Sequence, residues 1–184
     1  MKFLGSALKE TLTFLVLAVV IVVPIRLFIA QPFVVEGESM HPTFESTDYL
    51  VVNELIYRFH PPQRGDIVVF RLPGDLNKFL IKRVIGLPGE TVRIDHGVVS
   101  IITPAGATLD LDEPYVVAED ATYTQDAALG PDQYFVMGDN RPRSSDSRSW
   151  GTLPKQDIIG RVDIRLFPAN EIGFLPGKSN QPQQ

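Results

Sequence analysis

Two residues, Ser39 and Lys82, have the chemistry of a nucleophile and of a base able to activate it. Ser39 stands in a loop punctuated by glycine and proline, EGESMHPT at 36–43, directly after a strand candidate. Loops held by a rigid sheet often carry nucleophiles, but a lone serine in such a loop more often caps a turn. The serine alone leaves both interpretations open.

Lys82 belongs to an apolar strand candidate, FLIKRVI at 79–85. Strand alternation places Lys82 on one face with Leu80 and Val84, and Arg83 on the other. Because both faces are otherwise apolar, at least one of these cations must be desolvated or partnered. Full burial lowers the pKa of a lysine by up to ~3–5 units, giving a free amine that can take a proton from a serine. The strand alone favours the alternative, an edge strand whose two cations reach water along their stems.

A dense polar stretch, YFVMGDNRPRSSDSRSWGTL, runs from Tyr134 to Leu153. A short apolar strand candidate leads into a turn signal at 138–140, and arginine, serine and aspartate side chains follow. Asp146 and Arg148 can form an ion pair, with Ser144 close by in the sequence. A surface loop with scattered ion pairs is the alternative, because exposed pairs are common and weak.

Composition limits the classes of protein to consider. The 184 residues suffice for one domain with a real core, and 44% hydrophobic residues argue against disorder. The net charge of −5 argues against a nucleic-acid partner. The absence of cysteine excludes disulfides and thiol catalysis. His41, His60 and His96 lack metal-ligand spacing, so we expect neither a metal site nor a cofactor.

The N-terminal segment predicts a membrane anchor over residues 1–30. Residues 12–25, LTFLVLAVVIVVPI, are nearly unbroken in apolar character, and flanking apolar residues past Arg26 supply the roughly 20 that a span needs. A cleaved signal peptide is the alternative, but a cut after Ala30 would put the bulky Phe28 at position −3. The two lysines before the segment place the N-terminus in the cytoplasm and the rest of the chain outside, although Arg26 opposes them.

The remainder predicts a β-domain over residues 31–168. Runs rich in β-formers, separated by turn residues, are typical of strands. The segment at about 104–131, acidic and irregular from Pro114 on, predicts an excursion from the main sheet. The Pro/Asn/Gln-rich segment 169–184 predicts a flexible, frayed tail. The expected strands are 31–36, 48–55, 66–72, 79–85, 90–94, 98–102, 108–111, 134–137 and 158–167.

Four segments, in this order, resemble type I signal peptidase, a family of membrane-bound serine proteases that remove signal peptides from exported proteins. They are GESMHPT at 37–43, RGDIVVF at 64–70, KRVIGLPGE at 82–90 and GDNR at 138–141, which runs on through Ser144, Asp146, Arg148 and Trp150. The residues at 26–33 also resemble the family's membrane exit. The joint order and spacing of the motifs carries the resemblance and outweighs the alternatives above. It extends from the membrane segment through Phe167.

The resemblance implies a mostly antiparallel β-sheet catalytic domain on a single N-terminal transmembrane helix in the cell membrane. It implies Ser39 as the nucleophile and Lys82 as the neutral general base, with the Ser39 backbone N–H binding the oxyanion. Many members have a serine where this chain has Gly37, which leaves the second oxyanion donor open. The implied supporting residues are Ser144, which would orient the lysine amine, the pair Asp146 and Arg148, and Asp139, Asn140 and Arg141 in the same wall.

The family cuts signal peptides of exported preproteins after small residues at −1 and −3. Shallow apolar pockets would select such residues by excluding larger side chains. Membrane lipid is the second expected partner, and Phe33 and Phe44 can dip into it. Six apolar residues near the motifs are candidate pocket walls, although each can equally belong to the core; they are Phe33, Val35, Met40, Phe44, Leu80 and Ile81.

Three other functions compete with this one. A self-cleaving Ser–Lys repressor is disfavoured by the membrane segment and by the lack of a basic DNA-binding region. An inactive membrane-tethered β-domain is disfavoured because Ser39, Lys82 and Ser144 are all present. A Ser–His protease using His41 or His60 would leave Lys82 unexplained, and neither histidine has an evident carboxylate to orient it.

Overall fold

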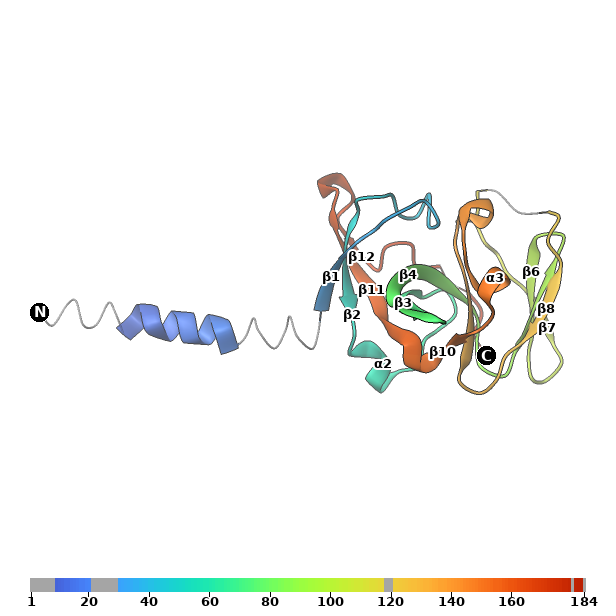
Figure 1. Cartoon of the computed structure of the whole chain (residues 1–184), viewed down its shortest axis with the longest axis horizontal. Coiled ribbons are helices and arrows are strands. Elements are labelled where there is room, and N and C mark those ends of the chain that lie inside the picture. Colours follow the sequence, from blue (N-terminus) through green and yellow to red (C-terminus); the bar gives the residue numbers. More distant parts are fainter. Residues whose placement is uncertain (1–8, 21–29, 118–120, 180, 184) are drawn as a thin grey trace, which may run out of the picture.

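The computed structural model describes residues 9–20, 30–117, 121–179 and 181–183. Residues 9–20 form a helix (Figure 1). Its large apolar side chains are exposed. Within the described ranges, no helix combines the length and the apolar character that crossing a membrane requires. The predicted span over 12–25 continues past residue 20, outside the described residues, and it therefore stays a prediction.

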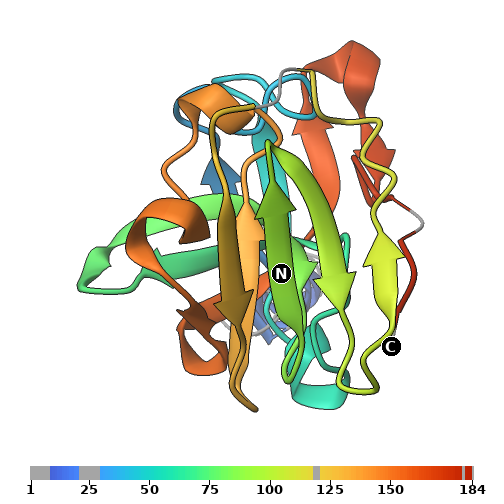
Figure 2. The same cartoon turned by 90° about the vertical axis from the view of Figure 1, so that its right-hand side faces the viewer.

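Two antiparallel sheets build the β-domain in the part of the chain that the structure describes, which confirms the predicted mostly β fold class (Figures 1 and 2). The larger sheet has eight strands in the order β1-β2-β11-β3-β4-β9-β10, with β12 paired to β11. Its strands are β1 (Ala30–Val34), β2 (Tyr49–Asn53), β3 (Ile67–Leu72), β4 (Asp75–Gly86), β9 (Gln133–Met137), β10 (Leu153–Pro154), β11 (Ile158–Phe167) and β12 (Gly173–Phe174).

The smaller, four-stranded sheet has the order β7-β6-β5-β8 and lies on the side of the domain away from β1 (Figure 1). Its strands are β5 (Thr91–Asp95), β6 (Val98–Ile102), β7 (Thr108–Asp110) and β8 (Gln125–Ala128). The helices of the β-domain are all short: α2 (Ile56–Phe59), α3 (Ser147–Trp150), and the 3-10 turns η1 (Arg141–Arg143), η2 (Lys155–Asp157) and η3 (Ala169–Glu171).

Strand β4 joins the two sheets and carries the central residues of the site. It pairs with β3 through Lys82 opposite Val68, and with β9 through Arg83 opposite Met137. Its first half is exposed, whereas its second half is buried between the apolar clusters of the two sheets. A burial gradient along one strand thus places residues 82–86 inside the protein while the β3–β4 hairpin extends outward.

Two predicted irregular segments are ordered parts of the fold. The excursion at about 104–131 supplies β7 and also β8, which pairs with β5 although its sequence, QDAA, has little β-propensity. The frayed tail is wrong for the described residues beyond 168, because β12 pairs with β11 and two buried arginines hold the segment. Arg83 donates to the carbonyl of Gly177, and Arg64 donates to that of Pro182.

Candidate active site

Lys82 and Ser39 meet in space. Ser39 is half-buried in the turn that connects β1 to β2, and Lys82 reaches it from β4. The Nζ atom of Lys82 lies 2.6 Å from Ser39 Oγ and also donates to the Ile81 carbonyl at 2.7 Å. The amine is therefore aligned on the serine hydroxyl by a second contact to its own strand.

Burial lowers the pKa of the Lys82 amine. The residue is only 2% exposed. Desolvation lowers its pKa from the ordinary 10.5 to about 8, an effect that Asp146 and Asp139 partly oppose by favouring the charged form. The prediction from strand alternation is confirmed for both cations, because Arg83 is also fully buried and paired. A lysine with a pKa of about 8 provides a substantial fraction of neutral base near physiological pH.

The turn that carries Ser39 is docked on the turn after β9. The backbone N–H of Asn140 donates to the Ser39 carbonyl at 3.1 Å, and its side-chain Nδ2 donates to the Glu38 carbonyl at 3.0 Å. Gly138 permits this approach, since a Cβ there would lie 2.3 Å from Ser144 Oγ and 2.4 Å from the Ser39 carbonyl oxygen. The backbone N–H of Ser39 has no acceptor among the described residues, which leaves it available to a ligand.

Arg83 and Asp139 form a buried ion pair behind the two reactive side chains. The guanidinium donates to both carboxylate oxygens, at 2.8 and 2.6 Å, and both side chains are essentially inaccessible to water. Thr43 Oγ1, in the turn that contains Ser39, donates to the same carboxylate at 2.5 Å. The ring of Tyr115 lies 3.8 Å from the guanidinium carbon of Arg83. Asp139 therefore ties the serine turn to β4.

Asp146 and Arg148 form the predicted ion pair, 2.8 Å apart and almost fully buried. Asp146 also accepts from the backbone N–H of Gly138 at 3.0 Å and caps α3 through the N–H of Arg148 at 3.2 Å. Arg141 donates to the Gly138 carbonyl and pairs with Glu113. These contacts brace the turn at 138–140 that supports Ser39.

Ser144 lies beside the dyad but does not contact the lysine amine. Its Oγ is buried and has no hydrogen-bond partner among the described residues. The predicted contact to Lys82 is therefore absent from this structure, in which the amine is engaged with Ser39 and Ile81. The orienting role of Ser144 stays a prediction, since an unpartnered buried hydroxyl keeps its donor and both acceptor sites available.

A groove of about 440 Å³ opens beside Ser39 and Lys82. Four of the six predicted wall residues line it, namely Phe33, Val35, Leu80 and Ile81. Met40 and Phe44 do not line it. They are 1% and 0% exposed and belong to the core between β1, β2, β3 and β11, because the turn after Ser39 folds its apolar side chains inward. For the same reason Phe44 cannot dip into lipid, and the prediction of both roles for Phe44 is wrong.

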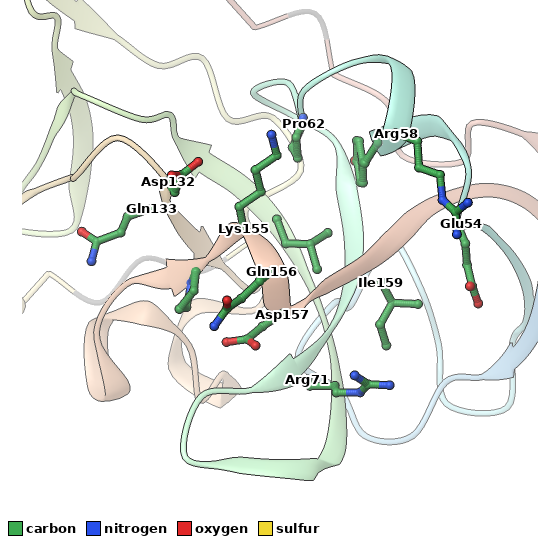
Figure 3. A pocket seen from close by; sticks show the side chains of 13 residues that line it. Glu54, Arg58, Pro62, Arg71, Asp132, Gln133, Lys155, Gln156, Asp157 and Ile159 are labelled. Atoms are coloured by element: carbon green, nitrogen blue, oxygen red, sulfur yellow. The ribbon is translucent and has the colours of Figure 1, made fainter.

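A larger, more polar cavity of about 820 Å³ lies elsewhere, against α2, β10 and η2 (Figure 3). Charged side chains of both signs line it, including Arg58, Arg71, Asp132, Lys155 and Asp157, and neither Ser39 nor Lys82 is among its residues. The smaller apolar groove, which touches both reactive side chains, is therefore the better candidate for a substrate site.

The chain offers one alternative base. His41 Nδ1 lies 2.6 Å from the Glu45 carboxylate, so the expectation that no carboxylate orients a histidine is wrong for His41. Both side chains are about half exposed, however, and the hydrogen-bond partner of Ser39 Oγ is Lys82. His60 is exposed at the end of α2.

Sequence reasoning overlooked the partners of the buried arginines. Arg83, Thr43, Glu113 and Tyr115 form a network around Asp139 and Arg141, but their partners are up to 96 residues away in the sequence. The second and third motifs also meet, since Arg64 and Glu90 form a fully buried, two-pronged ion pair. The one signal available was the presence of arginines inside apolar strands and motifs.

A serine hydroxyl on a buried lysine, beside an apolar groove in a β-domain, is suited to nucleophilic hydrolysis. The model of the family described as signal peptidase, peptidase S26, matches residues 8–167. The chain is 44% identical over 176 residues to probable signal peptidase I-1 of Synechocystis sp., which covers 91% of this chain and 87% of that protein. It is 38% identical to signal peptidase I S of Bacillus subtilis, with 86% and 88% covered.

The chain therefore belongs to the signal peptidase family, peptidase S26. Signal peptidase I of Leptolyngbya laminosa is a further relative, 40% identical over 92% of this chain and 85% of that protein. A crystal structure of a signal peptidase I from Enterococcus faecalis V583 is 35% identical, with a TM-score of 0.45, over 56% of this chain and 97% of that one. The family assignment rests on the sequence matches.

Proposed function

We propose that this protein removes N-terminal signal peptides from exported preproteins, with Ser39 as the nucleophile and Lys82 as the general base. The observation that carries the proposal is the 2.6 Å contact between the buried amine and the serine hydroxyl. Family membership and the names of the relatives, signal peptidase I, support the substrate class.

In the reaction, neutral Lys82 takes the proton of Ser39 as the Oγ atom attacks the scissile carbonyl carbon. The tetrahedral oxyanion binds the backbone N–H of Ser39. When the C–N bond breaks, the proton on Lys82 passes to the leaving amine of the mature protein. Lys82 then deprotonates a water, which attacks the acyl-enzyme and releases the signal peptide with a free carboxylate. The proton returns to Ser39 Oγ.

The groove supports a preference for small residues. Phe33, Val35, Leu80 and Ile81 leave an apolar channel next to Ser39, in which an extended peptide can lie with its small side chains against the walls. Val35 is 5% exposed, so it closes the channel at depth, and larger side chains would meet packed core. We propose selection at −1 and −3 by this exclusion.

We further propose that the N-terminal segment anchors the enzyme in the cell membrane, with the β-domain outside the cytoplasm. The helix at 9–20 exposes leucine, valine and phenylalanine on all sides, with exposures of 53 to 76% at its large apolar residues. A helix that is apolar all round needs an apolar surrounding, which lipid provides.

Cleavage of a preprotein in detergent tests the function. Wild type, S39A and K82A are compared on substrates with alanine or a bulky residue at −1. We expect wild type to cut only the alanine substrate, K82A to lose ~10²–10⁴-fold and S39A to be inactive. S100A and K155A are matched controls, because Ser100 lies on β6 and Lys155 lines the polar cavity. Retained activity in K82A together with a loss in H41A would point to the His41 alternative instead.

A further inference from the structure

The C-terminal segment, defined here as residues 172–179, contacts Arg83, the residue next to Lys82 on β4. The carbonyl of Gly177 accepts a hydrogen bond from Arg83 Nη1 at 2.6 Å. The same guanidinium holds Asp139, and Arg83 directly follows Lys82 on β4. The match to the family model ends at residue 167, so family membership assigns no role to this segment.

The segment is fixed in place. Phe174 and Gly173 of β12 pair with Ile164 and Arg165 of β11, and the backbone N–H of Leu175 donates to the Asp163 carbonyl at 2.7 Å. Two residues after Leu175, the chain presents Gly177 to the interior. Gly177 is therefore held by strand pairing on one side and by the buried Arg83 on the other.

No residue larger than glycine fits at position 177. Gly177 has φ +71°, and a Cβ would lie 2.2 Å from Thr43 Cγ2 and 3.0 Å from Ile67 Cδ1. Thr43 lies four residues after Ser39 in the same turn, and its hydroxyl donates to Asp139. A side chain at 177 must displace Thr43 or the segment itself, and either movement disturbs a partner of Asp139.

We propose that Gly177 is a positioning residue of the active site, whose close packing holds Thr43 and Arg83 on Asp139 behind Ser39 and Lys82. Gly177 touches no reacting atom and acts through these partners. The inference rests on the proposed Ser39–Lys82 mechanism and deepens it, because it assigns part of the catalytic geometry to a segment outside the four motifs that carry the resemblance.

Loss of this packing changes the electrostatic surroundings of Lys82. The charged groups that act on the amine are Asp146, Asp139 and Lys78, and Arg148 and Arg83 neutralise the two carboxylates. If Arg83 moves away from Asp139, the carboxylate is less compensated and favours the charged form of Lys82. A displaced segment therefore lowers the fraction of neutral base at a given pH.

The test compares G177A with G173A in the full chain. Gly173 is a matched control in the same segment, because the nearest atom to a Cβ there is the Glu171 carbonyl oxygen at 3.9 Å. We expect G177A to lose ~10–100-fold in kcat on a preprotein and to need a higher pH for activity, and G173A to match wild type. If folded G177A, counted by active-site titration, keeps the kcat and pH profile of wild type, the segment is merely structural and the proposal is overturned.

A rescue variant tests whether the effect of G177A is transmitted through Thr43. T43S in the G177A background deletes the methyl group that a Cβ at 177 would strike, and it keeps the hydroxyl that donates to Asp139. We expect the double variant to regain part of the lost kcat and to shift its pH profile back toward wild type. A double variant as impaired as G177A alone would show that the contact to Thr43 is not the cause.

A second readout does not depend on cleavage. NMR titration of labelled lysine reports the pKa of Lys82 in wild type, G177A and G173A. We expect a higher pKa in G177A than in the other two. Equal pKa values in all three proteins overturn the positioning role. Failure of wild type to cut preproteins overturns the proposed function, and the NMR comparison still decides what Gly177 does.

Discussion

The Nζ atom of Lys82 lies 2.6 Å from the Oγ atom of Ser39, although 43 residues separate them in the sequence. The serine comes from the turn after β1 and the lysine from β4, and neither strand pairs with the other. The contact therefore depends on the turn after β9, which docks on the serine turn through Asn140.

The pH dependence of catalysis is expected to follow the protonation state of the Lys82 amine. The base must be neutral, and burial lowers the pKa of Lys82 to about 8. We expect kcat/KM to rise roughly tenfold per pH unit below pH 8 and to level off above it. Cleavage rates from pH 6 to pH 10 at low substrate concentration measure this limb. A limb centred near pH 6.5 would instead indicate a histidine base.

Removing the lysine charge is expected to stabilise the fold at neutral pH. The folded pKa of about 8 lies below the ordinary 10.5, so the unfolded chain binds more protons between these values. Burying the charged amine costs roughly 3 kcal/mol below pH 8, and this cost disappears as the pH rises toward 10.5. K82M is therefore expected to gain stability at pH 7 and to lose that advantage at alkaline pH, as measured by urea unfolding at both pH values. An equal difference at both would contradict the assignment.

Substitution of Ser144 is expected to lower turnover without lowering the stability of the protein. Its buried hydroxyl makes no hydrogen bond to a described residue, so S144A removes an unsatisfied polar group and leaves the free energy of unfolding unchanged or raises it by about 1 kcal/mol. The family resemblance implies that the hydroxyl orients Lys82 during the reaction, and we expect turnover to fall ~10-fold or more. Unchanged turnover in a fully folded S144A would leave Ser144 without an orienting role.

Substitutions of Ile81 in the groove and of Phe44 in the core are expected to affect different properties, namely substrate selectivity and stability. Ile81 lines the groove, so I81A enlarges it and is expected to raise the relative rate for a substrate with valine at −1. Phe44 is fully buried in the core and does not line the groove, so F44A is expected to cost ~3–5 kcal/mol of stability without changing that ratio. Cleavage of paired alanine and valine substrates, with thermal unfolding of each variant, distinguishes the two residues.

Local sequence patterns predict most strand positions and the need for partners at buried cations. Alternation in β4 indicates that Lys82 or Arg83 needs burial or a partner unless β4 is an edge strand, and the apolar runs locate most strands of the main sheet. The same patterns do not reveal which apolar loop residues turn inward. They allow Met40 and Phe44 as groove walls or as core residues, and both residues lie in the core. An apolar side chain in a turn carries no period that would reveal its direction.

Long-range pairing was beyond the sequence. QDAA at 125–128 becomes strand β8 only because β5 offers it a partner, and nothing in its own residues favours a strand. The tail is ordered because Arg64 and Arg83, far upstream, need acceptors for their buried donors. Buried arginines in the motifs predicted that partners exist but could not identify the residues that supply them.

The position of β11 in the main sheet determines when the β-domain can fold during synthesis. Residues 158–167 lie between β2 and β3, so a nascent chain that ends earlier has a gap in the middle of its main sheet. Strand β2 then pairs only with β1, and the strands next to Ser39 and Lys82 do not belong to one continuous sheet. The chain must therefore be synthesised at least through Phe167 before the strands around the serine and the lysine share one sheet, which delays formation of the site until β11 has left the ribosome.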